Sequence, residues 1–217
     1  MKRNLILILS IFCSLISYSR EYHVSVNGND NHDGSVLKPY KTISAAVKTA
    51  YPGDTITVHA GTYREWVNPV RGGESDSRRI VYRAAPGEKV EIKGSEIITG
   101  WKKEKNGVWK VVIPNSFFGS YNPYKDSIFG DWFYDRGRIH HTGEVFLNGK
   151  SLYEKESIKM VYEPIPDNNI RDQEGSTYTW YCESDENYTT IWANFHKFNP
   201  NRELTEISTR RTCFYPE

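Results

Sequence analysis

The sequence predicts an all-β chain: the start of a parallel β-helix with an amino-terminal cap helix, interrupted by an antiparallel β-sandwich. Pro52 to Glu65 combines a turn, a strand of period two and a glycine corner, as the first rung of a stacked β-helix does. The apolar residues just before it recur at helical spacing. From about Ser95 onward, short alternating segments and most of the tryptophans indicate a second kind of β-domain.

Residues 1–19 have the pattern of a secretory signal peptide. A charged start and an apolar stretch from Leu5 to Ile16 precede the small residues Ser17 and Ser19. We therefore expect the mature chain to begin near Arg20 and to be secreted or periplasmic.

The charges of the chain are nearly balanced, with 28 basic and 27 acidic residues and a formal net charge of +1. This balance gives no electrostatic reason to expect nucleic acid or an anionic membrane surface as a partner. After the signal peptide, no segment approaches the roughly 20 apolar residues of a membrane span. A neutral saccharide fits better, and the aromatic content of 14 % suits either a β-rich core or sugar-stacking surfaces. No cofactor is predicted.

Residues 20–94 are predicted to form the cap and the first coil of the β-helix. Glu21 to Val26 alternates as a short strand, and Thr42 caps a helix that ends at Pro52-Gly53. Three strands follow, each with an apolar residue at every second position: Thr55 to His59, Ile80 to Ala84 and Val90 to Lys93. We interpret them as the three faces of about one coil. Because a solenoid needs roughly three or more stacked repeats for stability, one coil leaves its core uncovered.

Residues 95–205 are predicted to form a β-sandwich-like flanking domain. Asn148-Gly149 is the strongest hairpin signal, because both residues tolerate the positive φ of a type I′ turn. Glu206 to Thr209 then looks like a strand, so we expect residues 206–217 to return to the β-helix and the chain to be a fragment of a longer one. Alternation predicts the strands of the flanking domain at Val108 to Ile113, Glu144 to Leu147, Ser151 to Glu154, Tyr178 to Cys182 and Thr189 to Phe195.

Two cysteines, Cys182 and Cys213, remain after the signal peptide. They can pair in an oxidising compartment, but two cysteines do not make a disulfide framework. We favour two small buried apolar residues and leave the pairing open.

Ten short segments together form a recognisable pattern: Glu21 to Val24, Pro39 to Ile43, Gly53 to Ile56, Gly61 to Val67, Ser75 to Ile80, Ala84 to Val90, Pro114 to Gly119, Asn122 to Lys125, Ile128 to Trp132 and Arg210 to Pro216. They resemble the start of the glycoside hydrolase family 120 β-xylosidases. The segment from Asn115 to Trp132 is the most specific, whereas the glycine-turn motif is shared with pectate-lyase-like folds. The likeness covers essentially the whole mature chain but only about the first third of such an enzyme.

The resemblance implies a right-handed parallel β-helix, interrupted by a β-sandwich, that cleaves xylo-oligosaccharides with retention of configuration. The family's nucleophilic Asp and acid/base Glu lie on later coils, so no catalytic residue is assigned within this chain and we expect it to be inactive alone. A homo-oligomer is possible for the full-length protein.

Trp132 and Asp131 are the candidate substrate-binding residues. A sugar ring stacks its C–H bonds on an aromatic face, and a neighbouring carboxylate accepts hydrogen bonds from hydroxyl groups. The resemblance places the matching tryptophan near the sugar-binding groove. The alternative is a core tryptophan of the sandwich. Asp131, Asp135 and Glu144 are catalytic candidates by residue type alone, and solvated loop carboxylates are favoured.

No metal site is predicted. His140-His141 lacks further ligands at fixed spacing and is interpreted as surface histidines. Asp30 and Asp33 lack the spacing of a calcium loop and are interpreted as turn formers. We expect Arg64 and Glu65 to form a buried pair that braces the first corner.

Two other functions remain open from the sequence. A β-helix polysaccharide lyase is one, although the chain lacks the cluster of calcium-binding carboxylates that this chemistry usually requires. A non-catalytic carbohydrate-binding module that works at this length is the other.

Overall fold

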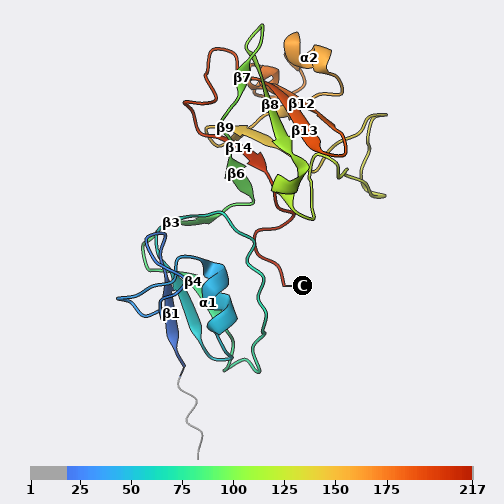
Figure 1. Cartoon of the computed structure of the whole chain (residues 1–217). Coiled ribbons are helices and arrows are strands. Elements are labelled where there is room, and N and C mark those ends of the chain that lie inside the picture. Colours follow the sequence, from blue (N-terminus) through green and yellow to red (C-terminus); the bar gives the residue numbers. More distant parts are fainter. Residues whose placement is uncertain (1–18, 217) are drawn as a thin grey trace, which may run out of the picture.

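The structure, a computed structural model, describes residues 19–216, so the predicted signal peptide lies outside it apart from Ser19. Two lobes are seen (Figure 1): an amino-terminal lobe, residues 20–94, and a second lobe, residues 95–211. Strands predominate in both lobes and the helices are short, which confirms the all-β class. No helix in residues 19–216 is long and apolar enough to cross a membrane.

The strands β1 to β5 of the amino-terminal lobe pair in parallel. One sheet has the order β1 (Glu21–Val24), β2 (Thr55–Val58) and β4 (Val81–Ala84). A second sheet pairs β3 (Gly61–Tyr63) with β5 (Val90–Ile92). The chain thus goes round twice, first through β2 and β3 and then through β4 and β5.

This arrangement corrects one prediction. The segments that begin at Thr55 and Ile80 were expected on different faces of one coil, but Thr57 lies opposite Arg83 in the same sheet. The strand that the sequence analysis did not predict is β3, which begins at Gly61. At Gly61 φ is +154°, and an added Cβ would lie 2.5 Å from Val26 Cγ1. The corner therefore needs glycine, and that glycine gave the appearance of a loop.

Helix α1 (Ile43–Thr49) forms where it was predicted. Thr42 Oγ1 accepts a hydrogen bond from Ala45 N at 3.1 Å, as a helix cap does. Ile43, Ala46 and Val47 are buried against the first sheet, in the core that also contains Val24 and Ile56. Among the other residues of this seven-residue helix, Lys48 is exposed and Ser44, Ala45 and Thr49 are partly buried.

The second lobe contains two sheets around one apolar core. The five-stranded sheet has the order β11-β12-β13-β8-β7, and the four-stranded sheet the order β10-β9-β14-β6. Only β11 and β12 pair in parallel within them; the other pairs are antiparallel. The strands are β6 (Ser95–Ile97), β7 (Lys102–Lys103), β8 (Val108–Pro114), β9 (Val145–Leu147), β10 (Lys150–Ser151), β11 (Tyr153–Glu154), β12 (Thr179–Ser184), β13 (Tyr188–Asn194) and β14 (Thr205–Ser208).

Local features of the second lobe follow its sequence closely. Asn148 and Gly149 have φ of +52° and +80° and join β9 to β10, which confirms the predicted hairpin. The core between the sheets includes Trp101, Trp180 and Phe195, each nearly inaccessible to solvent. Three short helical segments complete the lobe: η1 (Asn115–Phe118), α2 (Ile158–Tyr162) and η2 (Gly175–Thr177).

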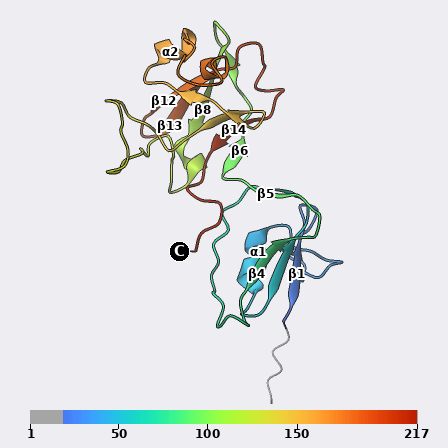
Figure 2. The same cartoon turned by 180° about the vertical axis from the view of Figure 1, so that it is seen from behind.

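The return of the chain to the amino-terminal lobe begins later than predicted. The strand expected to re-enter the β-helix, β14, instead pairs antiparallel with β6 and β9 and belongs to the second lobe. Phe214 makes the return, through a parallel bridge with Val67. Its ring meets the Tyr82 ring edge-on at 5.0 Å between centroids. In Figure 2 the carboxyl end lies back between the two lobes.

The entry and exit of the second lobe lie side by side. Thr209 N and Arg210 N both donate to Gly94 O, at 2.9 and 3.1 Å. We call this contact the neck. The second lobe thus begins and ends at the same place, after β5 and before Phe214.

The cysteines are unpaired. Cys182 is buried in the core of the second lobe, and Cys213 lies partly exposed in the return segment. Burial raises the pKa of the Cys182 thiol to about 12, so it stays protonated at neutral pH. Cys182 therefore behaves as the small apolar residue that was favoured.

Candidate functional site

A long loop projects from the second lobe between η1 and β9. We call residues 119–143 the projecting loop; Figure 1 shows it extending away from both sheets. Its two arms are tied together near the base, because Ile128 N donates to His140 O at 2.7 Å and Thr142 N donates to Asp126 O at 3.1 Å. The two ends of the projecting loop are thus held together by backbone hydrogen bonds.

Trp132 lies on the projecting loop with 75 % of its surface exposed. The alternative of a core tryptophan is therefore wrong. At Gly130 φ is +149°, and an added Cβ would lie 2.7 Å from Trp132 Nε1. Because glycine lets the indole edge lie against the backbone, the Phe-Gly-Asp-Trp order helps to orient the ring. The Phe133 ring supports it from one side, at 5.7 Å between centroids.

Asp131 is exposed beside this ring. Within residues 19–216 its carboxylate has no hydrogen-bond or ion-pair partner, so both oxygens are available as acceptors. An exposed indole face next to a free carboxylate can hold the apolar face of a ring and bind its hydroxyl groups.

The base of the projecting loop is held by a partly buried ion pair. His141 Nδ1 lies 2.6 Å from Glu154 Oε1, and Arg138 Nη1 lies 3.6 Å from Glu154 Oε2. His140 Nε2 contacts Asp135 O at 3.0 Å. The interpretation as surface histidines is therefore wrong for His141, which anchors the loop on β11.

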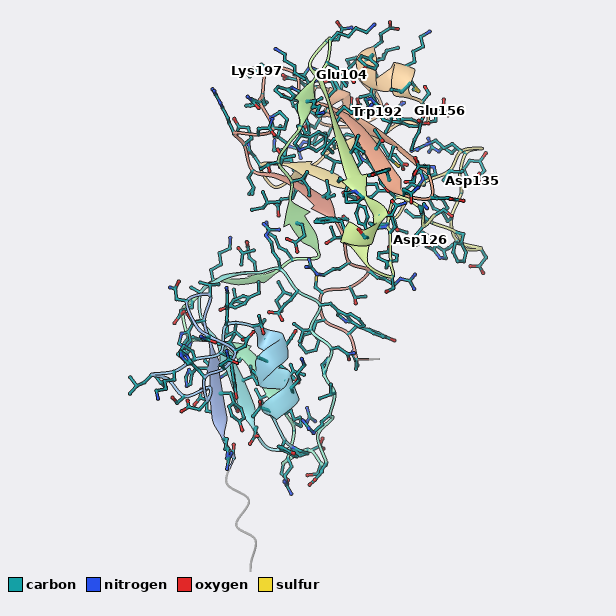
Figure 3. All side chains as sticks on the ribbon, in the orientation of Figure 1. Glu104, Asp126, Asp135, Glu156, Trp192 and Lys197 are labelled. Atoms are coloured by element: carbon teal, nitrogen blue, oxygen red, sulfur yellow. The ribbon has the colours of Figure 1, made fainter. Side chains whose placement is uncertain are left out.

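The other predicted polar residues serve local structure. Asp135 accepts from Gly137 N at 2.9 Å on the projecting loop, where Figure 3 labels it, and Glu144 accepts from Ser151 Oγ. Asp33 accepts from Ser35 N at 3.0 Å, as a turn former does, whereas Asp30 accepts from Lys41 N and Thr42 N, each at 2.8 Å, and so ties its loop to the start of helix α1. The described part of the chain holds no group of three or more His, Cys, Asp or Glu side chains placed to bind a metal ion.

Charged side chains gather where the lobes meet. Glu206 on β14 is only 2 % exposed, and its carboxylate lies 2.6 Å from Arg64 Nη1 and 3.2 Å from Lys93 Nζ. Ser95 Oγ also donates to it, at 2.9 Å. Burial alone raises the pKa of Glu206, but the hydrogen bonds from Arg64, Ser95 and Lys93 outweigh burial and lower the pKa below its usual value.

The predicted ion pair between Arg64 and Glu65 is therefore wrong, because Arg64 pairs with Glu206 instead. Arg64 reaches across to Glu206, which lies in the other lobe. Glu65 turns to helix α1 instead, where its carboxylate accepts from Ile43 N and Ser44 N, each at 2.9 Å. Sequence adjacency suggested the pair, but neighbouring residues on an extended segment point to opposite sides.

A cavity of about 660 Å³ lies where the two lobes meet the return segment, residues 212–216. We call it the junction cavity. Its walls come from Trp66 of the amino-terminal lobe, from Phe118, Ser120, Tyr121 and Thr209 to Arg211 of the second lobe, and from Thr212 and Tyr215 of the return segment.

Comparison with known proteins identifies the second lobe. Residues 98–207, just over half of the chain, match the family model described as "Glycoside hydrolase 120, insertion domain". The chain belongs to glycoside hydrolase family 120. Residues 26–69 of this family 120 chain also match a model described as "Protein of unknown function (DUF1565)".

Individual relatives agree with the family assignment. The family 120 chain is 45 % identical to a solved structure described as XylC in complex with xylose, with a TM-score of 0.85. That match covers 90 % of this chain and 32 % of the other, so this chain spans about a third of its relative's length. It is also 33 % identical over 75 residues to the uncharacterised protein YwoF of Bacillus subtilis (strain 168), which covers 35 % of this chain and 16 % of YwoF.

Sequence reasoning missed the residues at the junction of this family 120 chain. Glu206 gave only the signal of a charged residue inside an alternating strand. Arg211 and Trp66 gave none, since they are 145 positions apart (211 − 66) and meet only through the fold.

Proposed function

We propose that this chain is the amino-terminal part of a secreted or periplasmic, retaining β-xylosidase-like glycoside hydrolase that acts on xylo-oligosaccharides. The observation that carries the proposal is the 45 % identity, over 90 % of this chain, to XylC solved with xylose. Retaining hydrolysis needs two carboxyl groups about 5 Å apart. We place them on later coils, beyond Glu217, so this chain supplies binding surface rather than bond cleavage.

The proposal includes a specific architecture. The two parallel sheets are the first coils of a right-handed parallel β-helix, and the second lobe is a sandwich that flanks its groove. The parallel bridge between Val67 and Phe214 supports this, because it adds a third parallel contact to those of β2 with β4 and β3 with β5. Each of these contacts joins one turn of the chain to the next, as in a solenoid.

Trp132 and Asp131 are the residues that would bind the sugar. The indole face is exposed, Gly130 and Phe133 fix its orientation, and the His141–Glu154 pair holds the loop from below. A preorganised aromatic platform loses little conformational freedom on binding. The Asp131 carboxylate supplies hydrogen-bond acceptors for the hydroxyl groups at the edge of the ring.

The binding test is calorimetric titration of the chain with xylotriose. We expect Trp132→Ala to weaken binding about tenfold, because a stacked ring contributes roughly 1 to 1.5 kcal/mol. Phe129→Ala is the matched control, since Phe129 lies on the same loop and is 82 % exposed. It should leave the affinity unchanged. Equal affinities for the wild type and Trp132→Ala, or no binding by either, would contradict this assignment.

A rate assay addresses the placement of the catalytic carboxylates. The chain alone should not hydrolyse an aryl β-xyloside above the buffer rate, whereas a longer chain that includes the later coils should. Turnover by the chain alone would show that the carboxylates lie within it.

A further inference from the structure

The junction cavity has a chemistry different from that of the projecting loop. The aromatic residues Trp66, Tyr121 and Tyr215 line it together with Arg210 and Arg211, and the Arg211 guanidinium lies over the Tyr121 ring. Its volume of about 660 Å³ lies within the range of ordinary ligand pockets, roughly 300 to 1,000 Å³.

The aromatic wall is fixed in place. Trp66 Nε1 donates to Tyr215 O at 3.1 Å, which joins the amino-terminal lobe to the return segment. Tyr215 N in turn donates to Val67 O at 3.0 Å. Trp66 is 36 % exposed and Tyr215 is 57 % exposed. Both residues therefore offer accessible surface in addition to the hydrogen bonds that hold them.

The two arginines differ in their partners. Arg210 forms an ion pair with Glu96 and a hydrogen bond with Thr209 Oγ1. Arg211 has no carboxylate partner within residues 19–216. Its guanidinium lies over the Tyr121 ring, 4.8 Å from the centroid, which holds the group in position without using its N–H donors.

The neighbouring acidic side chains cannot serve as partners for Arg211 without losing their own. Glu96 is paired with Arg210, and Glu206 with Arg64 and Lys93. The cavity therefore carries one uncompensated positive charge. An arginine guanidinium matches a carboxylate with two parallel hydrogen bonds, and a ring stacked on its face leaves that edge free.

We propose that the junction cavity is a second saccharide site that binds a carboxylate-bearing sugar, a uronic acid residue. The carboxylate lies on Arg211, and the apolar face of the pyranose ring lies against Trp66 and Tyr215. This site is separate from the Trp132 surface and does not depend on the function proposed above.

The test uses sodium glucuronate, titrated into the chain at low ionic strength and followed by calorimetry and by the NMR signal of the Trp66 indole N–H. We expect saturable binding that weakens as salt is added, because the contact is between opposite charges. Arg211→Gln should weaken it at least tenfold, and Arg211→Lys should retain part of it. Arg202→Gln is the matched control: it removes an exposed arginine of the second lobe and should have no effect.

Glucuronamide, which has the same ring and no charge, separates carboxylate recognition from general sugar stacking. Binding of glucuronamide as tight as that of glucuronate would overturn the proposal. So would unchanged glucuronate affinity in Arg211→Gln, or no binding by the wild type. Because glucuronate and xylotriose are titrated separately, a negative result for one leaves the result for the other standing.

Discussion

Glu206 is the residue on which the contact between the lobes depends most. Its carboxylate is buried and is shared by Arg64 and Lys93, both of which belong to the amino-terminal lobe. A buried carboxylate is stable only when such partners replace the water it loses. The side chain therefore joins two lobes that otherwise meet mainly at the neck and through the return segment.

Glu206→Gln should destabilise the chain by about 2 to 3 kcal/mol at pH 7, because Arg64 and Lys93 lose their counter-charge while remaining partly buried. In the folded chain the pKa of Glu206 is lowered, so its contribution is present above the unfolded pKa, about 4.3, and is lost as pH falls through the folded pKa. Urea unfolding of wild type and variant at pH 7 and pH 3 checks this. The difference in unfolding free energy should shrink on acidification, and a constant difference would contradict the assignment.

For individual residues, the chemical role of a side chain was easier to predict from the sequence than the residue that it contacts. Trp132 and Asp131 were selected from residue type, and the structure places both at the surface with free faces. Arg64 was expected to pair with a glutamate and does, but with Glu206, which is far away in sequence. The junction cavity could not be predicted, because its walls come from three separate segments of the chain.

Helix α1 is an element whose start is held from outside the helix. It has seven residues, which is too short for stability in isolation. Thr42 caps one backbone N–H, and the Glu65 carboxylate accepts from Ile43 N and Ser44 N. Glu65, in the segment after β3, thereby fixes helix α1 onto the amino-terminal lobe.

Glu65→Ala should lower the unfolding free energy by about 1 to 2 kcal/mol, because two backbone N–H groups lose their acceptor and the helix N-terminus loses a favourable charge. Thermal unfolding followed by circular dichroism measures the change. Glu186→Ala removes an exposed glutamate of the second lobe and is the control. A loss no larger than that of the control would show that solvent replaces Glu65 without cost.

Elements defined by local signals were predicted well. The cap at Thr42 and the hairpin at Asn148-Gly149 depend on neighbouring residues, and both form as expected. The pairing of strands was not predicted well, because alternation of apolar residues shows that a segment is a strand but not which strand it pairs with. This is why β14 was expected in the β-helix although it pairs with β6 and β9.

The molecule as a whole consists of the amino-terminal lobe and a second lobe inserted between β5 and the return segment. The second lobe has its own core, and its ends meet at Gly94 and Thr209. Such a unit satisfies the requirements of an independently folding domain, which are a closed core and adjacent ends. The change of composition near Ser95 led us to expect a domain boundary there, and this boundary stays a prediction that folding of the isolated lobe would test.

Residues 95–209, expressed alone, should therefore unfold cooperatively in a thermal melt. Wild-type-like dispersion of the tryptophan indole N–H signals in the NMR spectrum would confirm native packing. A gradual, non-cooperative melt would show that the lobe needs the contacts of Glu206 with Arg64 and Lys93. Residues 20–94 alone are the comparison, and they should be less stable, because Phe214 no longer covers Tyr82.

The neck has a consequence for the order of events during synthesis. Val67 leaves the ribosome long before Phe214, and the whole second lobe is made between them. Since domains fold as units while the chain emerges, we expect the second lobe to fold before Phe214 can pair with Val67. Once Gly94 and Thr209 have met, the distance along the chain between β5 and Phe214 no longer adds to the entropy of closing the loop. The folded lobe thus acts as a short connection between β5 and the return segment.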